Sequence, residues 1–350
     1  MKLKLIHKHI LLELIPVFLI GNVFFIMLLL LDKLMNLADL FFTKSVPGWL
    51  IIQTIIYYMP SFFVITIPTS ALLAVIFVFG RMSSDSEIIA MRAAGAGKRF
   101  FLKPTMIFSG FVFIFGTMMS MWLMPAGSYH AAENILSMAK LVSIKDIKEK
   151  ELYEELSGFV FYAEKKLSDT SYERLMIIDK KHNSVITAKS AKVVPTGDAG
   201  LLLDLRDGSI VTIRDNGKHS AIKFDNFSIN APIVGADRVI IKTERLMAVN
   251  ELVDNFAKDP IFKFEFSKRL SMPFAAVIMS IFGMSIGMFF SRGGKSVAVP
   301  STIIIVIIYN MMFLTAENIV KSGGLEPFSA AWIPNIIFGI ISVFSYRRAL

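Results

Sequence analysis

Six long apolar stretches without a charged residue constrain this chain more than any other feature of its sequence. They cover residues 14–31, 51–79, 104–124, 270–291, 296–316 and 327–346. Each is at or near the roughly 20 apolar residues that a helix needs to cross about 30 Å of hydrocarbon. The second stretch also contains Pro60 and Pro68, which remove backbone donors and predict a tilt or a kink. The sequence therefore predicts a membrane protein with six transmembrane helices.

The composition agrees with this class. The chain has 350 residues, of which 54% are hydrophobic, too many for a soluble domain of this length. It has no cysteine, which excludes disulfides and thiolate metal ligands. Asp32 and Lys33 follow the first stretch without a small-residue cleavage site, so we expect this stretch to be a retained helix rather than a signal peptide.

The lysines and arginines near the predicted helix ends indicate the orientation of the chain. If the N-terminus is cytoplasmic, twelve of these residues lie in cytoplasmic segments and three in the short outer loops. This topology places both termini in the cytoplasm and the long segment between the third and fourth helices outside it. The net charge of +9 then follows from membrane topology, and we expect no nucleic-acid partner.

The long segment, residues 125–266, divides the chain into membrane parts 1–124 and 267–350. Its first part, 131–156, has helical spacing, and its later part has the alternation of antiparallel strands. Asp207-Gly208 and Asn216-Gly217 predict two-residue hairpin turns. We expect an extracytoplasmic all-β domain of six or more strands, which is either a filled sandwich or an open one that holds a ligand.

A short helix is predicted in the loop after the second apolar stretch. Ser84 and Glu87 have the spacing of a capping box, and Gly95 is a typical helix terminator, which gives a helix over 84–94. Such a helix is too short to be stable alone. Because it opens with Asp85 and Glu87, it suits a protein partner better than an anionic membrane surface.

Several segments now resemble one known family. "GRMSSDSEIIAMRAAG" (80–95) is similar to the cytoplasmic loop of LptF/LptG permeases, and "FSKRLSMPFA" (266–275), "SRGGKS" (291–296) and "AAWIPNIIFGI" (330–340) follow in the family's order. The resemblance covers nearly the whole chain. It implies that the inserted domain is jelly-roll-like and that the chain is a permease subunit, in the bacterial inner membrane, of an ABC-type lipopolysaccharide exporter.

The resemblance also implies partners. These are a cytoplasmic ABC ATPase dimer, a paralogous six-span permease and a periplasmic bridge protein that receives the lipopolysaccharide. The short helix would be the coupling helix that docks on the ATPase. Its expected contact residues are Ser84, Asp85, Glu87 and Arg92.

Lipopolysaccharide carries phosphates, so its site needs cations at the outer membrane surface. Four basic residues stand at the outer ends of predicted helices: Lys33, Lys268, Arg269 and Lys321. We expect them to contact the lipid, with Arg269 able to bind phosphate through two parallel hydrogen bonds. The alternative for each residue is ordinary anchoring of a long side chain at the interface.

Small residues of the fourth stretch, Gly283, Ser285 and Gly287, predict a close helix contact, either within the chain or with the second permease.

The sequence gives little sign of an enzyme. The glycine-lysine pairs at Gly97-Lys98 and Gly294-Lys295 lack the first glycine of a phosphate-binding loop. The five histidines form no metal-binding motif. We therefore expect no cofactor in this chain, with ATP and Mg²⁺ on the partner ATPase. The competing hypotheses are an ABC-linked mechanotransmission protein, a periplasmic scaffold that carries no lipid, and an intramembrane enzyme.

Overall fold

The computed structural model describes residues 2–42, 46–145, 149–156, 158–168, 170–195, 200–213, 219–232, 243–289 and 294–348. The chain divides into two compact units. The helical unit comprises residues 1–32, 56–129 and 243–350, and the second unit, 33–55 and 130–242, contains the sheet. Residues 125–129 and 243–266, which the sequence analysis placed in the inserted segment, thus belong with the membrane helices.

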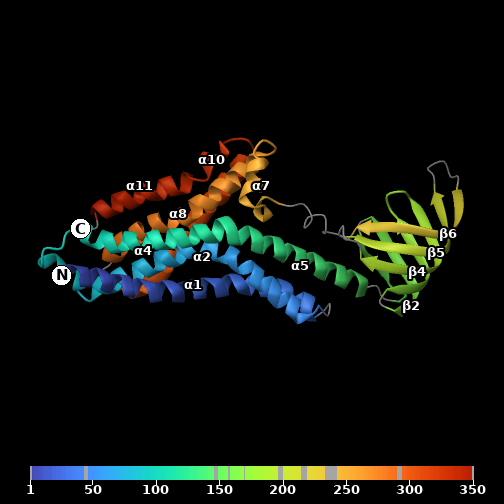
Figure 1. Cartoon of the computed structure of the whole chain (residues 1–350), viewed down its shortest axis with the longest axis horizontal. Coiled ribbons are helices and arrows are strands. Elements are labelled where there is room, and N and C mark those ends of the chain that lie inside the picture. The colour runs from blue at the N-terminus through green and yellow to red at the C-terminus, as the bar shows by residue number, and fades with distance from the viewer. Residues whose placement is uncertain are drawn as a thin grey trace. The chain divides into compact units, whose positions relative to one another are not determined.

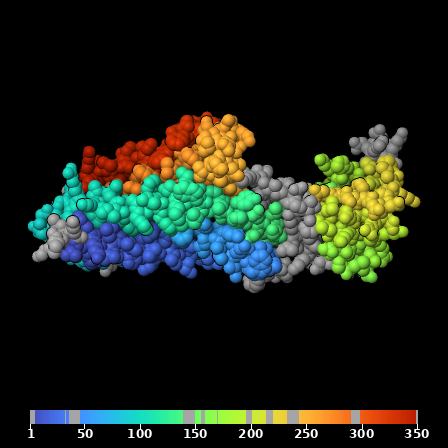
Figure 2. All heavy atoms as spheres, viewed as in Figure 1, coloured from blue at the N-terminus to red at the C-terminus, as the bar shows by residue number. Residues whose placement is uncertain are grey.

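Long helices α1, α2, α4, α8 and α11 run alongside one another in the helical unit (Figure 1). Their bounds are Lys2–Phe42, Gly48–Ser84, Lys98–Met118, Pro260–Phe289 and Ile333–Arg348, and α9 spans Gly294–Lys321. Among the described residues, five helices are long and apolar enough to cross a membrane. Side chains fill the spaces between the helices on the face that Figure 2 shows. The membrane-protein class is confirmed.

The third and sixth predicted spans depart from single regular helices. The third continues from α4 through a π-helical turn, Met119–Leu123, into α5, Met124–Lys145. The sixth is divided into α10, Pro327–Ala330, and α11, whose 16 residues cover about 24 Å at 1.5 Å per residue. Glu326 caps α10 by accepting hydrogen bonds from the amides of Phe328 and Ser329. A capped helix start at this point separates α10 from the preceding turn.

Glycines allow a close contact between α8 and α2. A Cβ on Gly287 would lie 2.9 Å from the Ile76 carbonyl oxygen, and one on Gly283 would lie 3.1 Å from Leu72. Both neighbours belong to α2. The predicted small-residue contact of the fourth span is therefore one within the chain, against the second span.

The short helix after α2 differs from its prediction. Ser84 is the last residue of α2, and the new helix, α3, covers only Glu87–Ala93. Its N-cap is Ser86, which has a φ of 60° and makes no side-chain capping bond, so the predicted Ser84 capping box is wrong. The C-terminus matches expectation: Gly95 has a φ of 89°, and the amides of Gly95 and Ala96 donate to Arg92 and Met91.

The inserted domain is one six-stranded antiparallel sheet in consecutive order (Figure 1). The strands are β1 Leu152–Leu156, β2 Phe159–Ser168, β3 Ser171–Asp179, β4 Ser184–Pro195, β5 Gly200–Ile213 and β6 His219–Pro232. A jelly roll implies Greek-key connections, whereas the described strands form a meander. The predicted helix over 131–156 ends as α5 at Lys145, and β1 follows.

One predicted hairpin is wrong. Asp207 and Gly208 lie inside β5, which continues through both of the strands predicted on either side of them. Asp207 has a φ of 51°, the backbone conformation that suggested a turn, but here it bends a continuous strand. The second predicted turn, Asn216-Gly217, lies outside the described residues.

The bend at Asp207 belongs to a line that crosses the sheet. On β3, Tyr172 and Leu175 both face the core, although residues three apart should lie on opposite faces. The same happens at 188 and 191 on β4, at 205 and 210 on β5, and at 224 and 227 on β6. Strands β3 to β6 therefore change which face their alternate side chains point to at paired positions, as strands do at a β-bulge.

Candidate functional site

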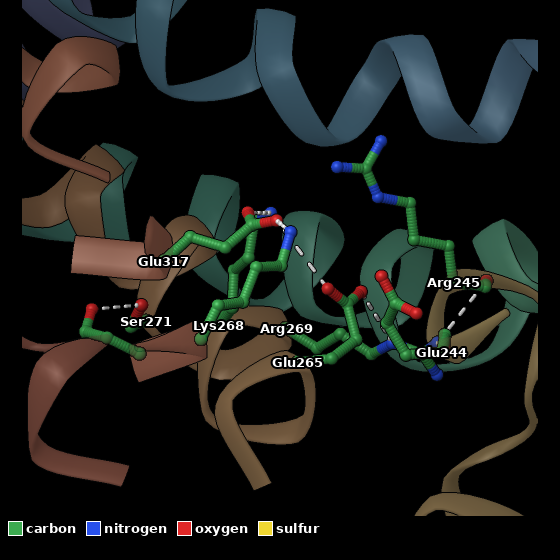
Figure 3. Close-up of polar contacts among 9 residues, drawn as sticks. Glu244, Arg245, Glu265, Lys268, Arg269, Ser271 and Glu317 are labelled. Carbon is green, nitrogen blue, oxygen red and sulfur yellow. Dashed lines mark hydrogen bonds and ion pairs between the residues drawn. The ribbon is translucent and has the colours of Figure 1, made fainter. Parts of the chain in front are cut away.

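Two basic residues named from the sequence meet around one carboxylate at the end of the helical unit that carries α10 and the short helix α7, Val249–Asp254 (Figure 3). Glu317 on α9 accepts from Lys321 Nζ at 2.8 Å and from Lys268 Nζ of α8 at 3.4 Å. Lys268 Nζ also lies 3.9 Å from Glu265. The carboxylates thus hold two ammonium groups close together.

The two lysines differ in access. The Lys321 side chain is 52% exposed, and that of Lys268 is 16% exposed. An ammonium group has three donors, so a pairing with one carboxylate leaves capacity for a second anion. Glu317 itself is buried, although it directly follows the fifth apolar stretch in the sequence, where an exposed helix end would be expected.

Arg269 has a different environment from the one predicted. Its side chain is 1% exposed, and it donates to the backbone carbonyl oxygens of Met247 at 2.8 Å and Glu244 at 3.0 Å. Its Nε lies 3.4 Å from Glu265. A guanidinium that is buried on these acceptors has no exposed face for a phosphate. The expectation that Arg269 binds lipid phosphate is therefore corrected: it lies beside the lysines but faces protein.

Lys33 lies on the part of α1 that belongs to the second unit, where it is half-buried. The structure thus brings together Lys268, Arg269 and Lys321 within the helical unit, whereas Lys33 belongs to the other unit.

Two of the predicted coupling residues, Asp85 and Glu87, meet at the other end of the helical unit around Arg81, which was not among the predicted contact residues. Arg81, in the last turn of α2, bonds Glu87 at 3.0 Å and Asp85 at 3.2 Å. It also pairs with Glu13 of α1. We call Glu13, Arg81, Asp85 and Glu87 the Arg81 cluster. The spacing of Arg81 and Asp85 could have suggested part of it, but Glu13 is 68 residues away along the chain.

The other predicted contact residues, Ser84 and Arg92, are exposed. Ile89 on α3 is 62% exposed, whereas Ile88 is buried among the side chains of α1, α2 and α4. The short helix therefore rests on the bundle by one side and presents an apolar and charged side outward.

The ends of the described chain lie near this cluster. The His7 ring packs at a tilt against Phe100 with ring centroids 4.3 Å apart, and Lys98 Nζ donates to the Arg347 carbonyl oxygen at 2.9 Å. The starts of α1 and α4 and the end of α11 thus share one end of the unit (Figure 1). Within the described residues, no group of three or more His, Cys, Asp or Glu side chains is placed to hold a metal ion.

Several apolar helices long enough to cross a membrane, with a β domain inserted between two of them in the sequence, define a multi-pass membrane protein. The particular family follows from comparison. A family model described as lipopolysaccharide export system permease LptF/LptG matches residues 8–348. The chain belongs to this family and is a multi-pass protein of the inner membrane.

Curated relatives agree with the family. The lipopolysaccharide export system permease protein LptF of Escherichia coli (strain K12) is 22% identical over 335 residues, which cover 92% of this chain and 89% of that protein. LptF of Shigella flexneri matches to the same extent.

Proposed function

We propose that this permease is the transmembrane subunit of an ABC-type exporter. It extracts lipopolysaccharide from the inner membrane and passes it to a periplasmic bridge, and a separate ATPase drives the process. The observation that carries the proposal is α3: a seven-residue helix that cannot be stable alone is fixed on the bundle by Arg81 and presents Ile89 outward. Such a helix is suited to transmit movement from a partner.

The proposed orientation follows the lysine and arginine distribution. The end with α3 and both chain ends is cytoplasmic, and the β domain is periplasmic. The proposed partners are an LptB-like ATPase dimer that binds ATP and Mg²⁺, a paralogous six-span permease and an LptC- or LptA-like bridge protein. Ser84, Asp85, Glu87 and Arg92 are the proposed contacts with the ATPase.

For the lipid we propose Lys268 and Lys321, together with Lys33, as partners of the phosphates. The support is chemical: two ammonium groups share one carboxylate at the end of the unit opposite α3, and Lys321 is exposed. Exposed apolar side chains on α9 below this point, such as Met311 and Leu314, provide a surface for acyl chains.

The test is a gentle purification of the tagged protein from its native membrane, followed by mass spectrometry of everything bound. We expect an ATPase, a second six-span permease and lipopolysaccharide. Glu87→Lys places a cation beside Arg81 and on the outward side of α3, so it should weaken ATPase recovery. Arg99→Glu, also an exposed charge reversal at this end, is the control.

Recovery of the ATPase without lipid would favour a mechanotransmission protein instead. Recovery of neither would favour a scaffold and contradict the proposal.

A further inference from the structure

The segment Thr243–Met247, which leads from the β domain to α8, accepts three hydrogen bonds from the side chain of Arg269 on α8. Its 3₁₀ turn, Glu244–Leu246, begins immediately before α7. Arg269 of α8 donates Nη1 to the Met247 carbonyl oxygen at 2.8 Å. Its Nη2 donates to the carbonyl oxygens of Glu244 at 3.0 Å and Arg245 at 3.3 Å. Three backbone acceptors of a five-residue segment thus converge on one guanidinium (Figure 3).

This arrangement is costly unless it is complete. A buried cation loses its hydrogen bonds to water and needs protein acceptors in their place, because an unpaired buried charge is strongly unfavourable. Arg269 is 1% exposed, and Glu265, one helical turn before it on α8, supplies a carboxylate 3.4 Å from its Nε. The remaining donors depend on the segment's carbonyl groups. If the segment moved away, the guanidinium would be left with fewer acceptors in a dry site.

The geometry also requires arginine. The planar guanidinium has donors on three nitrogens and can bond several separated acceptors at once, whereas a lysine ammonium carries all its donors on one nitrogen. Lys268, the neighbouring residue, is directed to Glu265 and Glu317 instead. The adjacent basic residues on α8 thus have different partners: Lys268 pairs with buried carboxylates, and Arg269 binds backbone carbonyl groups as well as Glu265.

We propose that Arg269 is a positioning residue that anchors the Thr243–Met247 segment to α8, so that a movement of α8 is passed to the connection with the β domain. Its contribution to export rests on the proposed function, but the anchoring itself does not. The two can therefore be tested apart. A loss of anchoring is measured on the segment, without lipid or ATPase.

The experiment uses the absence of cysteine from the natural sequence. Ala248→Cys, an exposed position next to the anchored carbonyl of Met247, carries a nitroxide label in the full-length protein in detergent. Arg269→Met keeps the apolar stem but removes the fork, and we expect a several-fold shorter rotational correlation time of the label. Arg269→Lys retains the buried charge and should show an intermediate value.

Lys321→Met is the matched control. It removes a cation from the same end of the unit, but this cation bonds Glu317 and not the Thr243–Met247 segment. It should leave the label unchanged. A second label at the exposed residue Thr315 on α9 reports whether each variant keeps its fold. If Arg269→Met does not fold, the comparison is made with Arg269→Lys.

The proposal is overturned if the label at 248 is equally immobile in a folded Arg269 variant and in the unsubstituted protein. Export is then measured in the same variants. If an Arg269 variant has a mobile segment and normal export, Arg269 anchors the segment but the anchoring is not needed for transport.

Discussion

Single residues in the β domain show how strongly local backbone geometry limits this fold. Gly208 is the clearest case. A Cβ at this position would lie 2.2 Å from the Thr187 carbonyl oxygen and 2.3 Å from the Phe224 ring. The first of these is backbone of the neighbouring strand and cannot turn away. The line of bulges therefore needs a residue without a side chain at this point of β5.

We expect Gly208→Ala to destabilise the β domain by about 1–3 kcal/mol, the usual cost of forcing extra atoms into a packed site. The measurement is the urea concentration at which a protease begins to cut the sheet in the full-length protein. Ser209→Ala, which removes only an exposed hydroxyl contact with Thr187, should change this midpoint little. An unchanged midpoint for Gly208→Ala would mean that β4 and β5 can separate at low cost.

A second residue-scale prediction concerns Asp179 at the end of β3. Burial opposes ionisation of its carboxyl, but bonds from His182 and from the amides of His182 and Lys181 outweigh burial and hold the pKa of Asp179 below 3.8. A carboxyl whose pKa is lower in the folded than in the unfolded state stabilises the folded domain at pH values above the unfolded-state pKa. This stabilisation is lost as the pH falls through the folded-state pKa.

The Asp179→Asn variant should therefore be less stable than the natural protein at neutral pH. The two should become alike once the pH has fallen below the folded-state pKa, where the natural carboxyl is protonated in both states. Protease-monitored urea unfolding at several pH values measures this. Asp225→Asn, an exposed carboxyl on β6, is the control. A constant difference between Asp179→Asn and the natural protein at all pH values would contradict the assignment.

Among the elements, α3 depends most on its neighbours. It has seven residues, its N-cap residue provides no capping bond, and its acidic start pairs with Arg81 of the preceding helix. Glu13 extends this cluster to α1, and His9 lies 3.1 Å from Glu13 on the same helix. The position of α3 is thus tied to the ends of both α1 and α2, which would let the three move together.

Arg81→Gln should loosen α3 and reduce the affinity for the ATPase roughly tenfold, because three partly exposed ion pairs at about 0.5 kcal/mol each amount to about 1.5 kcal/mol. Glu13→Gln, which leaves α3 chemically unchanged, should shift the affinity in the same direction but less. Binding of purified ATPase to the permease in nanodiscs measures both, with the exposed Arg99→Gln as control. Full affinity in both variants would show that α3 needs no support from α1.

At the scale of the whole molecule, a buried polar chain joins three membrane helices of the helical unit. Tyr309 of α9 donates to Asn335 of α11 at 2.9 Å, and Asn335 donates to the Ser271 carbonyl oxygen of α8 at 2.6 Å. Ser271 in turn donates to Ala331 at 2.8 Å, at the break between α10 and α11. Hydrogen bonds of this kind hold helices together where apolar contact alone gives little preference over lipid.

Asn335→Ala should destabilise the helical unit by about 1–3 kcal/mol, because it leaves the buried Tyr309 hydroxyl without its acceptor. Thermal unfolding of the detergent-solubilised protein measures this. Ile336→Ala is the control, since that side chain is 57% exposed on the same helix. Equal transitions for the two variants would show that the polar chain does not contribute to the stability of the bundle.

The sequence by itself determined the class of this protein and most of its helices. A run of about 20 uncharged apolar residues has a strong preference for hydrocarbon that does not depend on the rest of the chain. The short helix and the strands of the insert were also predicted, and the family resemblance was confirmed by the comparison. The predicted element boundaries were wrong where one local pattern fits two structures. Asp207 and Gly208 suit both a hairpin turn and a β-bulge, and pairing with the neighbouring strands produces the bulge.

Tertiary structure alone decided the partners of the charged side chains. Lys268 and Arg269 are adjacent in the sequence and look alike there, yet one reaches carboxylates near the surface and the other is buried against a backbone segment more than 20 residues away. The pairing of Arg81 with Glu13 could not be predicted, because the two residues are 68 positions apart in the sequence. Charge is a property of the residue, but its burial and its counter-charge are set by segments that folding brings together, and no local pattern records them.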